Sequence, residues 1–291
     1  AATLDVLGEE FKDAKVSGTI TMAGEGTWRA GVAAGKAKVG VRDGRVDHPG
    51  RKLLLEGIDL DLALDDVRRR RSPPHQSLRW KSGFFDEFPF GLGHVDFSLR
   101  GDQVSVEEGS VEIFGGEVVI AAFSFSTVRR EASVIARVVG IQVEKIVQFL
   151  PKIIASAQGR VDGTVSIHRS ITGVQVNSAT LALRAGELAD LRLAPTPGLI
   201  SGSLPPAILQ YYPGLGKIET GEVPLRADKL EMEFTPLGDS QGRTAVLHLA
   251  GGPVDPKLRA PVDLTINVRG PLDQLIKFGM DSRLKIGGGK P

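Results

Sequence analysis

The chain has no cysteine among its 291 residues, which excludes thiolate metal sites, catalytic thiols and disulfide bridges. No stretch approaches the roughly 18 consecutive apolar residues that a membrane-spanning helix needs. Neither sign of charge dominates, because 36 Lys and Arg face 35 Asp and Glu, and the net charge of +1 gives no long-range field for steering a polyanion. Aromatic residues make up only 5%, so an extended apolar surface would be mostly aliphatic. A general nucleic-acid binder is therefore not expected.

Glycine and proline are plentiful instead, with 36 and 17 residues spread along the chain and no obvious linker block. This composition is typical of a globular protein and favours a single β-rich segment spanning residues 1–291. The absence of thiols fits an oxidising compartment. The first residues, Ala1 to Asp5, contain no initiator methionine, basic stretch or apolar signal core. We therefore expect a soluble piece of a longer protein.

Short runs with an apolar residue at every second position recur from end to end, separated by Gly, Asp, Pro or charged turns. The intervening positions carry polar residues such as Asp59, Asp61, Glu231 and Asp263, so each run has a dry and a wet face. The pattern predicts half-buried strands in an antiparallel sheet. The clearest dry positions are Leu60, Leu62, Phe97, Leu99, Val104, Val106, Val111, Ile113, Val174, Val176, Leu181, Leu183, Leu230, Met232, Phe234, Leu247, Leu249, Leu264, Ile266 and Val268.

The sequence predicts fewer turns and helices than strands. Gly and Asp at residues 42–45 and 100–102 predict hairpin turns, since Gly can supply a positive φ there. Helical spacing of apolar residues occurs at residues 143–157, where Pro151 breaks or kinks the pattern, and at residues 271–284. A shorter helical turn is expected at residues 204–210. The predicted fold is mainly β, with two or three short amphipathic helices.

The many dry faces have two physical solutions. They can pack against each other in a closed sandwich or filled barrel. Alternatively, a long curved sheet can hold its apolar face open as a groove that an apolar guest fills. Periodicity does not decide between these two arrangements.

Signatures of catalysis and metal binding are absent. The five histidines are far apart in sequence and form no HExxH or His-x-His pair. Ser201 lies in a segment with the wrong glycine spacing for a nucleophile elbow, and residues 31–37 fit a phosphate-binding loop poorly. Adjacent acids such as Asp65 and Asp66 would point to opposite faces of a strand. We expect no enzyme activity, no cofactor and no metal.

Two local clusters stand out. Arg68, Arg69, Arg70 and Arg71 are the one concentration of charge, and they form either an exposed loop or a site for an anionic headgroup or partner. The phenylalanines of residues 84–90 form the densest aromatic cluster, which is either core packing at a sheet end or an apolar contact for a guest.

Three segments together resemble a known family. They are Gly-Arg-Val-Asp-Gly-Thr-Val-Ser-Ile at residues 159–167, Leu-Arg-Ala-Gly-Glu-Leu at residues 183–188 running on to Pro197-Gly198, and the strand and turn at residues 260–275. Upstream, residues 57–60 and 72–78 follow in the matching order. In these segments the chain resembles the C-terminal region of the YdbH branch of AsmA-like proteins, which are relatives of TamB.

The resemblance implies an elongated, incurved antiparallel sheet whose apolar groove carries phospholipid through the periplasm between the inner and outer membranes. In that reading the dry positions contact acyl chains, and transfer is passive sliding. The resemblance also implies a longer protein with an N-terminal inner-membrane anchor. An outer-membrane-side protein would then add to the C-terminal sheet edge. The alternative is a closed β-sandwich that recognises protein or glycan through its loops.

Overall fold

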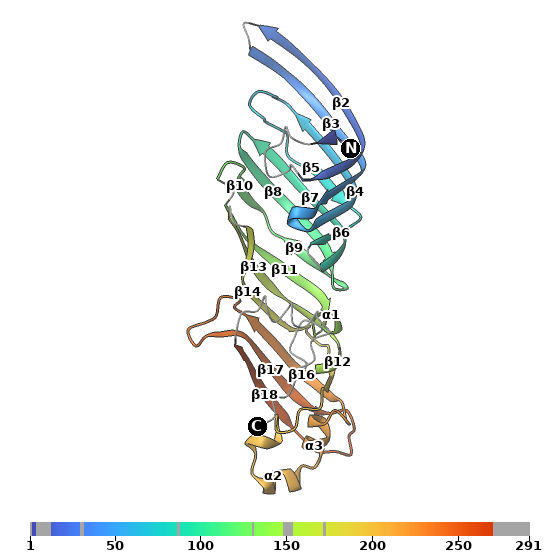
Figure 1. The fold of residues 1–291 in the computed structure, drawn as a ribbon, viewed down its shortest axis with the longest axis vertical. Coiled ribbons are helices and arrows are strands. Elements are labelled where there is room, and N and C mark those ends of the chain that lie inside the picture. Colours follow the sequence, from blue (N-terminus) through green and yellow to red (C-terminus); the bar gives the residue numbers. More distant parts are fainter. Residues whose placement is uncertain are drawn as a thin grey trace. The chain divides into compact units, whose positions relative to one another are not determined.

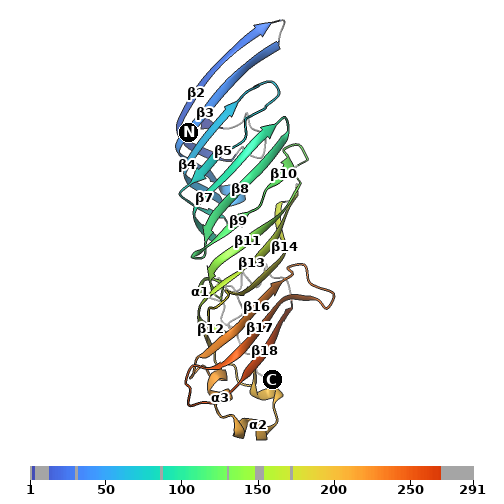
Figure 2. The same cartoon turned by 180° about the vertical axis from the view of Figure 1, so that it is seen from behind.

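The computed structural model describes residues 2–3, 13–29, 32–85, 88–129, 131–147, 154–170 and 173–269. The chain divides into two compact units. The N-terminal unit comprises Ala1–Arg137 and Ile167–Gln175, and the C-terminal unit comprises Val138–Ser166 and Val176–Pro291. Both consist mainly of antiparallel strands (Figures 1 and 2). The predicted mainly β fold, with antiparallel pairing and short helices, is confirmed.

The N-terminal unit is formed by strands that mostly pair with their neighbours in sequence. Its elements are β1 (Ala2–Thr3), β2 (Lys15–Arg29), β3 (Val32–His48), the 3-10 turn η3 (Pro49–Arg51), β4 (Leu53–Leu64), β5 (Gln76–Trp80), β6 (Ser82–Phe85), β7 (Phe88–Arg100), β8 (Gln103–Ile113), β9 (Gly116–Ile120) and β10 (Phe123–Ser126). The unit boundary falls within β11 (Ala132–Gln142), β13 (Arg160–Ser170) and β14 (Gly173–Leu183).

The C-terminal unit combines strands with short helices. Its elements are α1 (Val143–Val147), β12 (Ile154–Gln158), β15 (Ala189–Leu193), the 3-10 turn η4 (Ser201–Ser203), α2 (Pro206–Tyr211), α3 (Gly214–Glu219), β16 (Leu225–Phe234), β17 (Arg243–Pro253) and β18 (Val262–Arg269). Strand β16 pairs with β15 near its start and with β14 near its end, while β17 follows its other edge. The helix α3 packs against β15 and η4.

The predicted strands are confirmed, and several are longer than the alternation indicated. One expected hairpin is correct, since Gly101 turns the chain between β7 and β8 with a φ of 64°. The other is wrong, because residues 42–45 lie inside β3. Asp43 has a φ of 47°, and the register shifts between Val41 and Gly44, so the Asp-Gly pair makes a β-bulge instead of a turn.

The helix expected at residues 143–157 is only partly correct. It begins at Val143 and continues to Val147 as α1, but Ile154–Gln158 is a strand that pairs with β15. Pro151 opposes a continuous helix, and the pairing with a strand some 35 residues later is invisible to local spacing. The turn expected near residues 204–210 is α2. The helix expected at residues 271–284 lies outside the described residues.

The hydrophobic core lies in the C-terminal unit. Among the described residues, the largest side chains with under 2% exposure all belong to it: Val143, Val161, Leu191, Leu193, Ile218, Leu225, Leu230 and Leu249. Helix α3 contributes Ile218 from outside the sheet. The N-terminal unit buries Ile58 and Val106 to 8% and 7% exposure.

A buried carboxylate fixes the loop that caps this core. Glu219 of α3 is only 4% exposed, and its carboxylate accepts hydrogen bonds from the backbone amides of Gly198, Ile200 and Ser201 at 2.6, 2.9 and 2.6 Å. Burial alone would raise the pKa of Glu219, but these hydrogen bonds outweigh it and hold the pKa below its ordinary value. The loop between β15 and α2 is therefore held to α3 by charge-assisted hydrogen bonds.

Candidate lipid-binding surface

One face of the N-terminal unit carries a continuous row of apolar residues across seven strands. Directly paired residues of antiparallel strands point to the same face, so the register identifies the row. Across β2, β3, β4, β5, β7, β8 and β9 its members are Ile20, Val41, Leu60, Leu78, Val95, Gly109 and Ile120. At a strand spacing of about 4.8 Å, six steps make a track of about 29 Å.

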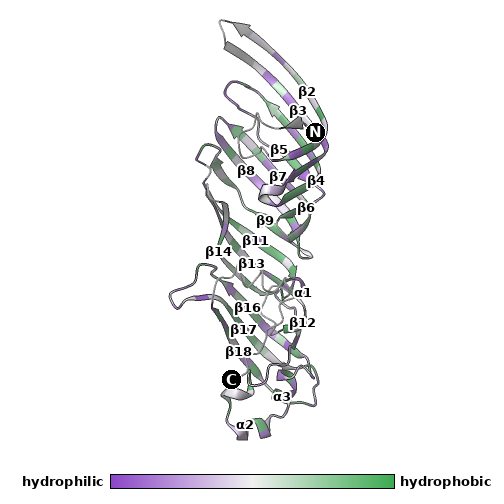
Figure 3. Ribbon diagram, in the orientation of Figure 1, coloured by the Kyte–Doolittle hydropathy of each residue, from purple (hydrophilic) through white to green (hydrophobic). Residues whose placement is uncertain are grey.

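Shorter rows of the same kind flank it. They are Met22, Val39 and Leu62; Phe97, Val106 and Phe123; and Leu99, Val104 and Phe125. The strands of this unit carry both hydrophobic and hydrophilic segments along their length (Figure 3). We call the face that holds these rows, together with Trp80, Val111 and Ile113, the apolar face.

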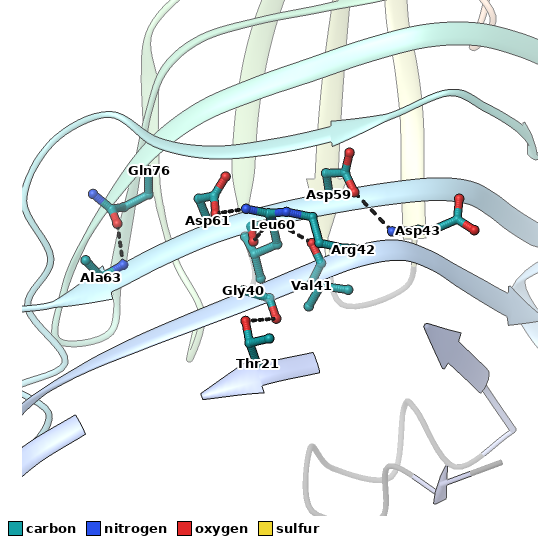
Figure 4. A network of polar contacts seen from close by, with 10 residues as sticks. All are labelled: Thr21, Gly40, Val41, Arg42, Asp43, Asp59, Leu60, Asp61, Ala63 and Gln76. Atoms are coloured by element: carbon teal, nitrogen blue, oxygen red, sulfur yellow. Dashed lines mark hydrogen bonds and ion pairs between the residues drawn. The ribbon is translucent and has the colours of Figure 1, made fainter. Parts of the chain in front are cut away.

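The neighbouring row on the opposite face is polar. It reads Thr21, Gly40, Asp61, Ser77, Asp96 and Glu108 from β2 to β8. Figure 4 shows part of this side, where Arg42 donates to the Leu60 carbonyl at 3.0 Å and to the Asp61 carboxylate at 2.6 Å. The bond to Asp61 raises the pKa of the Arg42 guanidinium. The sheet of the N-terminal unit is therefore amphipathic.

Bulges keep the apolar residues of β8 on one face. Val106 and Val111 are five positions apart, so a regular strand would point them in opposite directions. The register shifts by one residue at Glu107, which is the extra residue opposite Asp96 and Phe97. As a result Val104, Val106, Val111 and Ile113 share the apolar face.

The apolar face is only partly covered by the protein. Of the predicted positions in this unit, Leu60, Leu62, Phe97, Leu99, Val104, Val111 and Ile113 are half-buried, and Val106 is buried. At the β2 end, Ile20 is 59% and Met22 76% exposed. Large side chains with this exposure on a continuous row form an accessible apolar surface.

The structure also adds residues to this face that the sequence did not single out. Examples are Ile20, Met22, Val39 and Trp80, whose ring lies over Gly93 on the neighbouring strand. In β2 glycines at positions 18, 24 and 26 interrupt the alternation on both sides of Ile20 and Met22, which explains why the pattern was missed. The Thr-Ile-Thr-Met segment at residues 19–22 was the available signal.

The predicted positions in the C-terminal unit have different surroundings. Five of them are at most 9% exposed: Leu181, Leu230, Met232, Leu247 and Leu249. Leu183, Phe234, Leu264, Ile266 and Val268 are half-buried, and Val176 is 39% exposed. Val174, at the start of β14, belongs to the N-terminal unit, and its side chain is outside the described set. The most central of these residues are therefore covered by the protein itself.

The four arginines form an exposed loop between β4 and β5. Arg70 pairs with Asp102 at 3.0 Å, and Arg69 lies 3.8 Å from Asp66. In the aromatic cluster Phe84 and Phe85 are 45% and 49% exposed, so this cluster is not a closed core.

No group of three or more His, Asp or Glu suited to a metal ion occurs within the described part of the chain. Within the same residues, no helix has both the length and the apolar character needed to cross a membrane.

A comparison with known protein families gives a match over more than half of the chain. Residues 9–199 match the model of the YdbH-like family, described as intermembrane phospholipid transport protein YdbH. The match includes the segments at residues 159–167 and 183–198 and ends before the third segment at residues 260–275. Neither a curated protein nor a solved structure matches the chain. Because the matched range exceeds half of its length, the chain belongs to the YdbH-like family of intermembrane phospholipid transport proteins.

Proposed function

We propose that this chain takes part in moving phospholipid between two membranes, and that acyl chains lie on the apolar face of the N-terminal unit. The observation that carries the proposal is the apolar row from Ile20 to Ile120, which crosses seven strands, is exposed at Ile20 and is half-buried along most of its length. Membership of the YdbH-like family supports phospholipid as the guest.

Area burial supplies the affinity. Each 100 Å² of apolar surface removed from water contributes about 2.5 kcal/mol, without any specific polar contact. The face is lined by Val, Leu and Ile at most positions, so an acyl chain meets similar side chains at each strand. A guest bound in this way has no deep minimum along the row, which suits passive sliding and requires no catalytic residue.

The proposal divides the predicted contact residues by their exposure. The acyl contacts are Leu60, Leu62, Phe97, Leu99, Val104, Val111 and Ile113, with Ile20 and Met22 added, whereas Val106 is 7% exposed and is not assigned as a contact. The buried residues of the C-terminal unit form its core, and its half-buried residues on β18 are secondary contacts. The wider setting is the periplasm, in a longer protein anchored in the inner membrane and reaching the outer membrane, where another protein adds a strand to the C-terminal edge. The family match supports the periplasmic, intermembrane part of this setting.

The experiment is solvent extraction of the purified protein, followed by mass spectrometry of the lipids and native mass spectrometry of the intact complex. We expect phospholipid at near-stoichiometric amounts. The double variant Leu62→Asp with Leu99→Asp should fold and retain much less lipid, because two charges would lie beneath the acyl chain.

The matched control adds two charges to the opposite face, as Thr21→Asp with Ser98→Asp. It should retain lipid at the wild-type level. Equal lipid loss from both double variants would contradict the assignment of the face. A cooperatively folded wild-type protein that purifies free of lipid and takes up none would contradict the proposed function itself.

A further inference from the structure

The C-terminal unit carries an exposed apolar feature outside its core. Helix α2 has no buried residue, and with its flanks it forms residues 204–213, Leu-Pro-Pro-Ala-Ile-Leu-Gln-Tyr-Tyr-Pro. Ile208 is 39% and Tyr211 77% exposed, and the rings of Tyr211 and Tyr212 meet edge to face with centroids 4.9 Å apart. Both ribbon views show α2 at the extremity of the C-terminal unit, beyond α3 (Figures 1 and 2). We call residues 204–213 the tyrosine tip.

The tip lies in the longest uncharged stretch of the sequence. Residues 193–216 contain no Asp, Glu, Lys, Arg or His, although 24% of the chain is charged. Exposed segments of a soluble protein ordinarily carry many of its charges, since charged residues are mostly exposed. Because the tip has no charge that must lose its water, it can enter an apolar medium without that desolvation penalty.

Anchored segments on both sides position the tip. Before it, the carboxylate of Glu219 holds the loop at residues 198–201 through three backbone amides. After it, α3 buries Leu215 and Ile218. Helix α2 therefore stands between two fixed segments and keeps its apolar side chains outside the core.

Much of the backbone of the tip is already hydrogen-bonded internally. The amide of Ile208 donates to the Pro205 carbonyl at 2.9 Å, and the amide of Tyr212 donates to the Ile208 carbonyl at 2.8 Å. Pro205, Pro206 and Pro213 have no N–H group that needs a partner. Backbone groups that are bonded within the segment can leave water without an unsatisfied donor, as an apolar medium requires.

The chemistry of the tip favours a lipid bilayer as its partner. Tyrosine combines an apolar ring with a polar hydroxyl, which suits the boundary between headgroups and acyl chains. With six residues α2 is about 9 Å long, comparable with the roughly 5–10 Å to which interfacial helices bury their apolar faces. Apart from Gln210 and the tyrosine hydroxyls the tip has no polar side chain, whereas a protein interface ordinarily has a polar rim.

The charged residues that border the tip suit an anionic membrane surface. A Cβ at Gly214 would lie 3.0 and 3.3 Å from the Cβ atoms of Ala260 and Leu258, so residues 255–260 adjoin the start of α3. The exposed charged residues of α3 and of residues 255–260 are one acid and three cations: Asp255, Lys217, Lys257 and Arg259. This surplus of positive charge complements the negative surface of a bilayer that contains anionic lipid.

We propose that the tyrosine tip inserts into the headgroup region of a phospholipid bilayer and attaches the C-terminal unit to that membrane. This inference rests on the proposed function only in its choice of partner, because lipid that moves between two membranes has to enter or leave a bilayer. Ile208 and Tyr211 are the penetrating side chains. Lys217, Lys257 and Arg259 face the membrane surface around them.

The first test uses the absence of cysteine, which allows one label to be attached at a chosen position. Tyr211→Cys and Leu237→Cys are each labelled with a polarity-sensitive fluorophore and mixed with vesicles of phosphatidylcholine and phosphatidylglycerol. Leu237 is the matched control, since it is 74% exposed in the turn between β16 and β17 of the same unit. We expect the emission at position 211 to shift to shorter wavelength and the emission at position 237 to stay unchanged. Equal shifts at both positions, or no shift at position 211, would overturn the proposal.

The second test measures how much of the protein floats with the same vesicles in a density gradient. Ile208→Ser with Tyr211→Ser should lower the vesicle partition coefficient about tenfold, because two exposed apolar side chains that would leave water are removed. The control Leu188→Ser with Leu237→Ser removes two side chains that are 53% and 74% exposed elsewhere in the unit, and it should float as the wild type does. An equal loss in both variants, or none in the tip variant, would overturn the tip as the membrane contact.

Lipid bound to the same preparations separates this proposal from the proposed function. The tip variant should retain phospholipid at the wild-type level, because its apolar face is unaltered. A wild type that holds no lipid and takes up none, yet shows the shift at position 211, would contradict the proposed function and leave the tip intact. Sedimentation velocity without vesicles tests a second copy as the partner. Self-association of the wild type that is lost in the tip variant would overturn the bilayer as the partner.

Discussion

The two units have the same alternating sequence pattern, but their apolar residues have different surroundings. Leu62 in β4 and Leu249 in β17 each stand between polar or small neighbours, yet Leu62 is half-buried and Leu249 is 1% exposed. The difference lies in what covers the sheet. In the C-terminal unit α3 packs against β15 and adds buried Leu215 and Ile218, whereas the apolar face of the N-terminal unit stays partly uncovered. An amphipathic strand therefore specifies a dry face without specifying what covers it.

The largest effect is expected from a charge placed in the covered sheet. Leu249→Asp should destabilise the C-terminal unit by more than about 4 kcal/mol, because it buries an unpaired carboxylate. Leu62→Asp should cost less than about 1.5 kcal/mol, since water reaches that position. Amide hydrogen exchange resolves the two units, and tryptophan fluorescence follows the N-terminal one, which holds both tryptophans, Trp28 and Trp80. Comparable losses of stability in the two variants would contradict the contrast between a covered and a partly uncovered sheet.

Next in size is the buried carboxylate of the C-terminal unit. Glu219→Gln should cost about 1.5–3 kcal/mol, because the backbone amides of the capping loop lose a charged acceptor. The folded-state pKa is lowered, so this stabilisation is fully present above the ordinary value of 4.5 and is lost as the pH falls through the folded pKa. Denaturant unfolding of both proteins from pH 7 to pH 3 checks this. The difference in unfolding free energy between the wild type and Glu219→Gln should narrow towards pH 3. A difference that stays constant would contradict a stabilising role for the ionised Glu219 carboxylate.

A smaller effect is expected in the N-terminal unit at Gly93. A Cβ there would lie 2.1 Å from the Trp80 ring, so Gly93→Ala should displace the indole and cost about 1–2 kcal/mol. The tryptophan emission maximum should shift with the loss of stability. Gly202→Ala is the control, since no atom lies within 4 Å of the Cβ it would add. An unchanged emission spectrum in Gly93→Ala would show that Trp80 does not pack there.

The smallest effects are expected from exposed ion pairs, and they should be alike in the two units. Arg42 pairs with Asp61 at 2.6 Å in the N-terminal unit, and Arg226 pairs with Asp190 at 2.8 Å in the C-terminal unit. The hydrogen bond from Arg226 lowers the pKa of Asp190. Arg42→Gln and Arg226→Gln should each lower the Tm by no more than about 3 °C, because solvent screens both pairs. A much larger Tm shift in one unit would show that the two units also differ in how strongly an exposed ion pair stabilises them.

The sequence predicted the strands well because alternation is a local property. It identified Leu62 and Leu249 as dry positions, but their different exposure depends on what packs over each sheet in the folded chain, which the alternation does not encode. The Asp43-Gly44 bulge and the Ile154–Gln158 strand were missed for the same reason, since each is defined by its pairing with a distant strand. The backbone bridge between Arg71 and Arg100 could not be predicted from the sequence either, because it joins residues 29 positions apart.

The central claim is that acyl chains occupy the apolar face of the N-terminal unit, and Trp80 on that face can report it. The most direct measurement is fluorescence of the Trp28→Phe variant loaded with phospholipid brominated on its acyl chains, compared with the same lipid without bromine. Native mass spectrometry confirms equal loading. The account predicts strong quenching of Trp80 by the brominated lipid, because bromine quenches an indole only at close approach. Unquenched emission from a fully loaded protein would contradict it.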